Sequence, residues 1–262
     1  MADLTKRKPL ALANWKMAMT VAESLAYVQE FRNLAGDVLD QVDVVICPPF
    51  TAIWALAQVL PGSHLELGAQ DQAAVSDPAY TGQVSAALLA DAGCRWVMLG
   101  HWEVRRYRDD DDSLVNRKIY LALQASLHPI LLVGEGAQEH QPLEGILAGR
   151  LERLLANCKP DDAEQMVFLY EPEVAIGASG PLSPEGAARG CGLIRNWLAA
   201  RFGHLAAQKI RIIYGGSVSP AHATGLLSCP DVDGLGASRK GRNPASFAQI
   251  VRTIAQVKVG FS

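Results

Sequence analysis

Three features that decide the fold follow one another in the stretch Met166-Val167-Phe168-Leu169-Tyr170-Glu171-Pro172-Glu173-Val174-Ala175-Ile176-Gly177. The apolar run over 166–170 is short and continuous, which is typical of a strand buried in a parallel sheet. Glu171 ends that run, and a carboxylate at the mouth of a buried strand can become an effective proton acceptor through desolvation. The flexible loop around Gly177 can fold over a small substrate and exclude water. This order favours an enzyme that removes a proton from carbon, and the alternative is a solvated glutamate on a connecting loop.

The same kind of apolar run recurs along the chain and alternates with longer amphipathic segments. Expected strands are Leu10–Ala13, Val42–Cys47, His64–Gly68, Trp96–Leu99, Pro129–Val133, Met166–Tyr170, Ile210–Tyr214 and Val232–Leu235. Expected helices are Ala22–Ala35, Ala52–Val59, Ser85–Ala92, Ser113–Ser126, Ile146–Asn157, Pro184–Phe202, Pro220–Leu227 and Ala245–Lys258. Eight strands in strict alternation with eight helices predict a closed (β/α)8 barrel of the α/β class, formed by residues 1–262 as a single domain. An open doubly wound sheet is the alternative.

Composition narrows the possible functions. The chain has 262 residues, 49% of them hydrophobic, and its 24 basic and 27 acidic side chains give a net charge of −3. No basic stripe predicts nucleic-acid binding, and no apolar run reaches membrane-spanning length. The five cysteines are scattered and contain no Cys-x-x-Cys pair, so neither zinc nor another cofactor is expected, and reduced thiols favour the cytoplasm. We expect the run Asp109–Asp112 to be a solvated loop that leads into a helix, without a metal.

Polar residues gather where the expected strands end, and the ends of barrel strands converge on one face. They are Asn14-Trp15-Lys16, Gly100-His101-Trp102-Glu103, Glu171, Gly215-Gly216-Ser217 and Gly234-Leu235-Gly236-Ala237-Ser238. Each has an ordinary alternative, because Lys16 suits a surface, His101 suits a helix cap and the glycine pair suits a tight turn. Glycine-rich loops offer backbone N–H groups that hold phosphate. Together, a base, a cation, an imidazole and a phosphate anchor suit proton transfer next to the carbonyl of a phosphorylated sugar.

Several longer segments carry a resemblance to a known family. They are Asn14-Trp15-Lys16, Leu99-Gly100-His101 with Glu103, Tyr170-Glu171-Pro172 with Ala175-Ile176-Gly177, Tyr214-Gly215-Gly216-Ser217-Val218, Gly68-Ala69-Gln70-Asp71 and Tyr80-Thr81-Gly82. On these segments the chain resembles the triosephosphate isomerases over nearly its whole length. The resemblance implies a TIM barrel that interconverts dihydroxyacetone phosphate and D-glyceraldehyde 3-phosphate through an enediolate. In this family the pKa values of the catalytic groups are known to be tuned by their surroundings, and the resemblance implies the same for this chain.

The resemblance also implies a role for each site residue. Glu171 would be the base, His101 a neutral acid that polarises the carbonyl, and Lys16 a cation near the developing oxyanion. Asn14 would be a hydrogen-bonding neighbour of Lys16, and Glu103 would orient that lysine through an ion pair. Phosphate contacts are expected from Asn14, Lys16, Gly177, Ser217, Leu235 and Gly236. The loop from Gln70 to Gln83 resembles the family's dimer loop, which implies a homodimer with Thr81 near the neighbouring active site.

Three segments depart from the family pattern. Trp102 stands where the family has a serine that holds the catalytic glutamate, the lid hinge reads Pro172-Glu173-Val174 where a tryptophan is usual, and the segment Asp233–Ser238 is shorter. These departures keep two alternatives open. One is an isomerase of a related sugar phosphate, such as a tetrulose phosphate. The other is a catalytically impaired relative that binds phosphometabolites.

Overall fold

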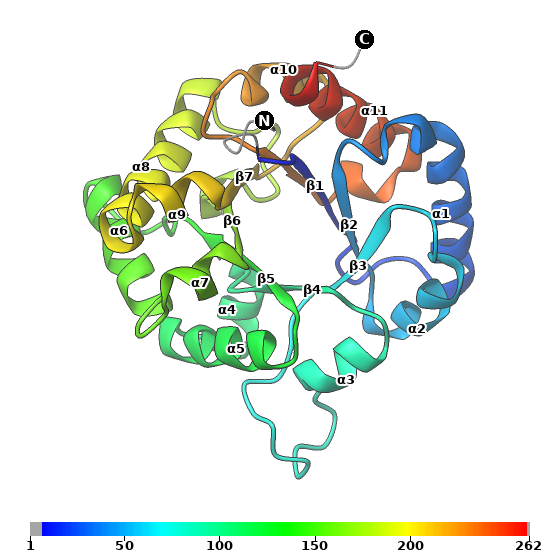
Figure 1. Ribbon diagram of the computed structural model, residues 1–262, viewed down its shortest axis with the longest axis horizontal. Coiled ribbons are helices and arrows are strands. Elements are labelled where there is room, and N and C mark those ends of the chain that lie inside the picture. The colour runs from blue at the N-terminus through cyan, green and yellow to red at the C-terminus, as the bar shows by residue number, and fades with distance from the viewer. Residues whose placement is uncertain (1–6, 261–262) are drawn as a thin grey trace.

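Eight parallel strands close into a barrel in a computed structural model that describes residues 7–260. Each strand pairs with the next one in sequence, and the eighth returns to pair with the first. Figure 1 looks along the barrel and shows the helices as a ring outside it. The predicted closed barrel is therefore confirmed and the open doubly wound sheet is wrong. Residues 1–6 and 261–262 of the predicted domain lie outside the described part of the chain.

The strands lie close to the positions that the apolar runs predicted. They are β1 Leu10–Asn14, β2 Asp43–Cys47, β3 Leu65–Ala69, β4 Trp96–Leu99, β5 His128–Val133, β6 Val167–Tyr170, β7 Arg211–Gly215 and β8 Gly234–Ala237. Their register places Asn14 of β1 beside Cys47 of β2, and Tyr170 of β6 beside Val133 of β5 and Tyr214 of β7. The ends of the strands therefore form one rim, where residues after several strands meet.

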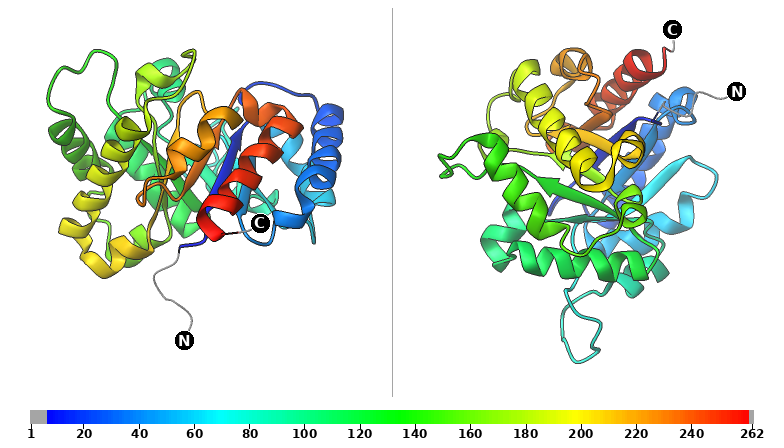
Figure 2. Two further views of the ribbon diagram at one scale, coloured as in Figure 1. Left: turned by 90° about the horizontal axis from the view of Figure 1, so that it is seen from above. Right: turned by 60° about the vertical axis from the view of Figure 1, so that its left-hand side comes forward.

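The helices of the outer ring fill the connections between these strands. They are α1 Val21–Ala35, α2 Phe50–Val59, α3 Ala86–Asp91, α4 Trp102–Arg108, α5 Asp112–Gln124, α6 Leu143–Leu154, α7 Pro160–Glu164, α8 Pro184–Phe202, α9 His204–Lys209, α10 Pro220–Leu227 and α11 Pro244–Ile254. Short turns of other helix types are η1 Gly36–Val38, η2 Glu173–Ala175, η3 Lys240–Arg242 and η4 Ala255–Val259. In the left panel of Figure 2, α11 lies beside β1, and α1 packs against α11. Our sequence prediction lacked α4, α7 and α9, because each is too short to show a helical period.

Alternate residues of the strands belong to two separate apolar cores. Leu10 and Leu12 of β1 point into the barrel, where they meet Leu169 and other side chains from the inner faces of the strands. Ala11 and Ala13 point outward and pack under the helices. Because both faces are covered, each strand is buried on both sides, and this explains why the strands are continuous apolar runs in the sequence.

The last strand corrects one prediction. We expected it at Val232–Leu235, but β8 runs over Gly234–Ala237. Asp233 precedes it, and its carboxylate binds Arg7, Arg195 and the N–H of Ile212, so this residue is a junction below the strand. Position 234, where the strand begins, requires glycine because a Cβ there would lie only 1.8 Å from the carbonyl oxygen of Leu10. Close approach of two backbones thus explains a glycine at the start of a strand, where propensity alone disfavours it.

The acidic run corrects a second prediction. Asp111 caps α5 by accepting a hydrogen bond from the N–H of Leu114, so the predicted helix start is confirmed. The expected solvated loop is wrong for two of the four residues, since Asp110 is 6% exposed and Asp112 is 9% exposed. Asp110 binds the buried ammonium of Lys118 at 2.5 Å, and Asp112 binds Arg105 and Arg153. Burial is tolerated because both carboxylates are paired.

Candidate active site

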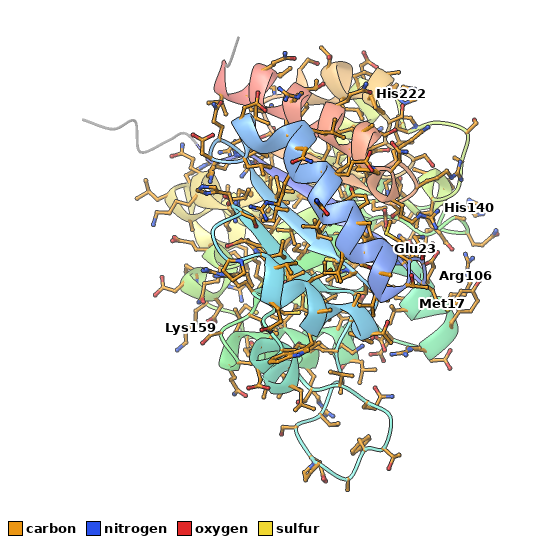
Figure 3. The ribbon with its side chains drawn as sticks, turned by 90° about the vertical axis from the view of Figure 1, so that its right-hand side faces the viewer. Met17, Glu23, Arg106, His140, Lys159 and His222 are labelled. Atoms are coloured by element: carbon orange, nitrogen blue, oxygen red, sulfur yellow. The ribbon has the colours of Figure 1, made fainter. Side chains whose placement is uncertain are left out.

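The loops that follow the strands gather at one end of the barrel. Figure 3 shows Met17, Arg106, His140 and His222, from the segments after β1, β4, β5 and β7, at that end. Lys159, which precedes β6, lies at the opposite end. Among the described residues no helix is long and apolar enough to cross a membrane, and no group of three acidic, histidine or cysteine side chains could hold a metal ion.

Glu171 directly follows β6 and is almost completely buried. Its N–H donates to the carbonyl of Val133 at 2.9 Å, which continues the pairing of β6 with β5 by one residue. Its Oε2 atom has no hydrogen-bond partner in the described part of the chain. Desolvation raises the pKa of Glu171 to about 7, although the positive charge of Lys16 opposes that shift. A carboxylate with this pKa can hold a proton or release it near neutral pH, as a general base must.

His101 lies directly across from that carboxylate. Its Nε2 atom is 3.6 Å from Oε2 of Glu171, which is too long for a hydrogen bond and leaves the two groups facing each other. The ring also caps α4, because Nδ1 accepts a hydrogen bond from the N–H of Glu103 at 3.1 Å. That bond requires an unprotonated Nδ1, so the neutral ring carries its proton on Nε2. Burial, helped by Lys16, lowers the pKa of His101 to about 4.

Lys16 follows β1 in a left-handed backbone conformation, with a φ of 54°. Two hydrogen bonds hold it there, because its N–H donates to Oδ1 of Asn14 at 2.9 Å and its carbonyl accepts from Nε2 of Gln70 at 2.8 Å. The ammonium binds Oε1 of Glu103 at 2.5 Å. Such a conformation is costly for a residue other than glycine and is found mainly where a side chain must be aimed. The structure thus brings Asn14, Lys16, His101, Glu103 and Glu171 together.

Trp102 contacts the backbone of Glu171, which the sequence did not indicate. Its Nε1 donates to the backbone carbonyl of Glu171 at 2.9 Å, so the indole holds the main chain while the carboxylate stays free. The guanidinium of Arg150 stacks on the indole with Cζ 4.7 Å from the ring centre. The hinge beside it is also held, since Glu173 binds Arg106 and accepts from the N–H of Ala137.

The loop over 176–182 lies over the site as a lid and is hydrogen-bonded to β7 and to the segment that follows it. The hydroxyl of Ser217 donates to the carbonyl of Ala178 at 2.9 Å, and the hydroxyl of Tyr214 accepts from the N–H of Leu182 at 2.9 Å. Ser217 also has a left-handed backbone, with a φ of 47°. These contacts fix the lid against the barrel.

A cavity of about 320 Å³ lies under this lid. Lys16, Glu171, Gly177, Ser217 and Gly236 all line it, so it joins the candidate base to the candidate phosphate contacts. Leu235 does not line the cavity, because it lies inside β8 with a fully buried side chain packed under the helices. The wall beyond β8 comes instead from Ser238, Arg239, Lys240 and Arg242, with His222 from α10. We did not single out these basic residues, although a basic cluster directly after the last strand was a visible signal.

Comparison with known proteins agrees with this geometry. The family model for triosephosphate isomerase matches residues 9–254. A triosephosphate isomerase of Carboxydothermus hydrogenoformans is 39% identical over 250 residues, which cover 94% of this chain and 98% of that protein. One of Symbiobacterium thermophilum is 39% identical over 254 residues, covering 96% and 99%. One of Citrifermentans bemidjiense is 40% identical over 255 residues, covering 94% and 98%.

Proposed function

The chain belongs to the triosephosphate isomerase family, and we propose that it interconverts dihydroxyacetone phosphate and D-glyceraldehyde 3-phosphate through an enediolate. The observation that carries this proposal is that His101 faces Glu171, whose carboxylate lines the cavity under the lid. An unpartnered carboxylate oxygen next to a ring N–H supplies a proton acceptor and a proton donor close enough together to act on one small sugar phosphate. This reaction belongs to glycolysis and gluconeogenesis.

Glu171 acts as the base. Its carboxylate takes a proton from the carbon next to the carbonyl, and the electron pair of the broken C–H bond moves to form the enediolate. The protonated carboxyl then returns the proton to the neighbouring carbon. His101 helps to move the proton of the terminal hydroxyl to the former carbonyl oxygen, and the two transfers together convert the ketose to the aldose. A pKa of about 7 supports both steps that Glu171 performs, because transfer is efficient when the base has a pKa near the working pH.

His101 and Lys16 stabilise the oxygen that becomes negative. The neutral imidazole donates its Nε2 proton toward the carbonyl oxygen, and the ammonium of Lys16 supplies positive charge that Glu103 keeps in place. Asn14 fixes the backbone of Lys16. Positioned base catalysis gives a rate gain of about 10²–10⁴. Preorganised charge in a cavity that excludes water would supply the further acceleration.

Backbone groups of the lid and of the segment after β7 hold the phosphate, with the end of β8 beside them. Gly177 of the lid, Ser217 and Gly236 line the cavity beside Lys16, and Leu235 would contribute only through its backbone. A phosphate held there keeps the reacting carbons between the base and the imidazole.

A coupled spectrophotometric assay of the purified protein tests the proposal. We expect turnover of both triose phosphates that is abolished by phosphoglycolate, with weaker turnover of four-carbon ketose phosphates. Preference for a tetrulose phosphate would assign the same mechanism to another substrate. Binding of phosphoglycolate without turnover of any sugar phosphate would contradict the isomerase assignment.

We further propose that the chain is a single catalytic domain that works in the cytoplasm as a homodimer. The loop from Gln70 to Gln83 extends from the barrel in Figure 1. A hollow of about 220 Å³ beside Lys16 and His101 offers a matching site, and Met17 and Tyr107 next to it are 99% and 74% exposed. In this arrangement Thr81 of one copy approaches the active site of the other. Sedimentation that finds only monomer at micromolar concentration would contradict it.

A further inference from the structure

Three cations follow β8 and line the cavity that holds the candidate base. Arg239, Lys240 and Arg242 are all exposed, and none makes a side-chain ion pair or hydrogen bond within residues 7–260. Arg195 and Arg211, near the other end of the barrel, bind aspartates instead. The cations at the cavity are therefore available for an anion that enters it.

The backbone that carries these side chains is fixed. The carbonyl of Gly241 accepts hydrogen bonds from Nε1 of Trp15 at 3.1 Å and from the hydroxyl of Tyr27 at 2.7 Å, and both donors are buried. Gly241 lies so close to β1 that a Cβ would be 3.2 Å from Cβ of Ala13. The backbone of segment 239–242, called the platform below, is therefore held in place, so that binding a ligand costs little backbone entropy.

The charge balance of the cavity favours an anion beside this platform. Glu103 is paired with Lys16, and burial raises the pKa of Glu171, so neither carboxylate neutralises the platform. A phosphate dianion would meet positive charge on this wall. Arginine is the side chain best suited to it, because its planar fork can donate two parallel hydrogen bonds to phosphate oxygens.

The position of these arginines directly after β8 gives them a specific task. Gly236 pairs with Leu12 and Gly215, and Ala237 pairs with Ala13, so the backbone of both residues belongs to the barrel ladder. The amides of these two residues are therefore committed to strand pairing and are less available to a ligand. We propose that the guanidinium groups of Arg239 and Arg242 bind the substrate phosphate directly, in place of those amides. The inference rests on the proposed function, since it concerns the phosphate end of the same site.

Paired substitutions test this assignment. Arg239→Lys and Arg242→Lys keep the charge and remove the fork, whereas Arg239→Gln and Arg242→Gln remove both. Arg201→Gln, in the last turn of α8, is a matched control for loss of one charge far from the cavity. The first readout is the dissociation constant of inorganic phosphate, measured by calorimetry at low and high salt. The second is the separate change in KM and kcat on the triose phosphates.

Direct contact predicts that each glutamine variant weakens phosphate binding about tenfold to a hundredfold, with a larger change in KM than in kcat. Each lysine variant should recover only part of the loss, and the loss should persist at high salt. Lysine variants that match the unsubstituted protein, or losses that vanish at high salt, would indicate long-range attraction and overturn the assignment. Because phosphate binding needs no turnover, an inactive protein whose variants still lose phosphate would contradict the proposed reaction and leave the platform supported.

Discussion

The indole N–H of Trp102 donates a hydrogen bond to the backbone carbonyl of Glu171, with 2.9 Å between nitrogen and oxygen. The carboxylate of Glu171 therefore keeps its Oε2 atom free while its main chain is held. The guanidinium of Arg150 stacks on the indole ring, with Cζ 4.7 Å from the ring centre. Trp102 is thus a positioning residue for the base.

Trp102→Phe should lower kcat by about threefold to tenfold, because it removes one neutral hydrogen bond and keeps an aromatic ring against Arg150. Trp102→Ser should lower it further and also reduce stability, since the ring contact is lost. Steady-state kinetics with both variants check this expectation. Trp197→Phe, in the second half of α8, is the matched control. Identical kinetics for all three variants and the unsubstituted protein would reduce Trp102 to a packing residue.

Glu171→Gln should lower turnover by several powers of ten, because an amide cannot accept the carbon-bound proton. Binding of inorganic phosphate should stay within about twofold, since that anion is held by other loops. Kinetics and calorimetry on the same preparation measure the two quantities. Unchanged turnover would remove Glu171 as the base, and a parallel loss of phosphate binding would point to general disruption of the site.

The sequence predicted the barrel and the clustering of Glu171, His101 and Lys16 because both depend on local signals. Apolar runs mark doubly buried strands, and Glu171, His101 and Lys16 each directly follow one or stand within two residues of its end. The course of β8 was less predictable, because the position of Gly234 depends on contact with Leu10 from the far end of the chain. The contact of Trp102 with Glu171 joins residues 69 positions apart and has no local signature. Asp110 and Asp112 are buried because cationic side chains pair with them, and an acidic run alone does not indicate such partners.

The carboxyl of Glu171 and the imidazole of His101 should titrate at well-separated pH values. Burial raises the pKa of Glu171 to about 7 and lowers that of His101 to about 4. Between pH 5 and 9 we therefore expect one carboxyl transition, near neutrality, and an imidazole that stays neutral. Carbon-13 spectra of glutamate side chains and nitrogen-15 spectra of histidine rings can follow both, with Glu171→Gln identifying the first signal. An imidazolium signal from His101 at pH 6 would contradict this order.

The raised pKa of Glu171 also predicts how stability depends on pH. The folded state binds this proton more tightly than the unfolded state, whose carboxyl has a pKa of 4.5, so stability falls as pH rises from 4.5 to about 7. Glu171→Gln should therefore increase the free energy of unfolding at pH 8, by at most about 3 kcal/mol, and change it little at pH 4. Urea denaturation at both pH values measures this. Glu152→Gln, on the exposed side of α6, is the control, and equal effects at both pH values would refute the desolvation argument.

The hydrogen bonds that hold the lid should affect the rate of ligand dissociation and not the rate of association. Tyr214→Phe removes the hydroxyl that accepts from the N–H of Leu182, and Ser217→Ala removes the donor to the carbonyl of Ala178. Either change should destabilise the closed lid and weaken phosphoglycolate binding by about tenfold, the effect of one or two hydrogen bonds. Dissociation should become faster while association changes little, because the lid must be open for entry. Stopped-flow binding kinetics separate the two rates. Tyr120→Phe is a matched control, since its hydroxyl bonds to Ala156, far from the cavity. A slower association with unchanged dissociation would show that these hydroxyls act before the lid closes.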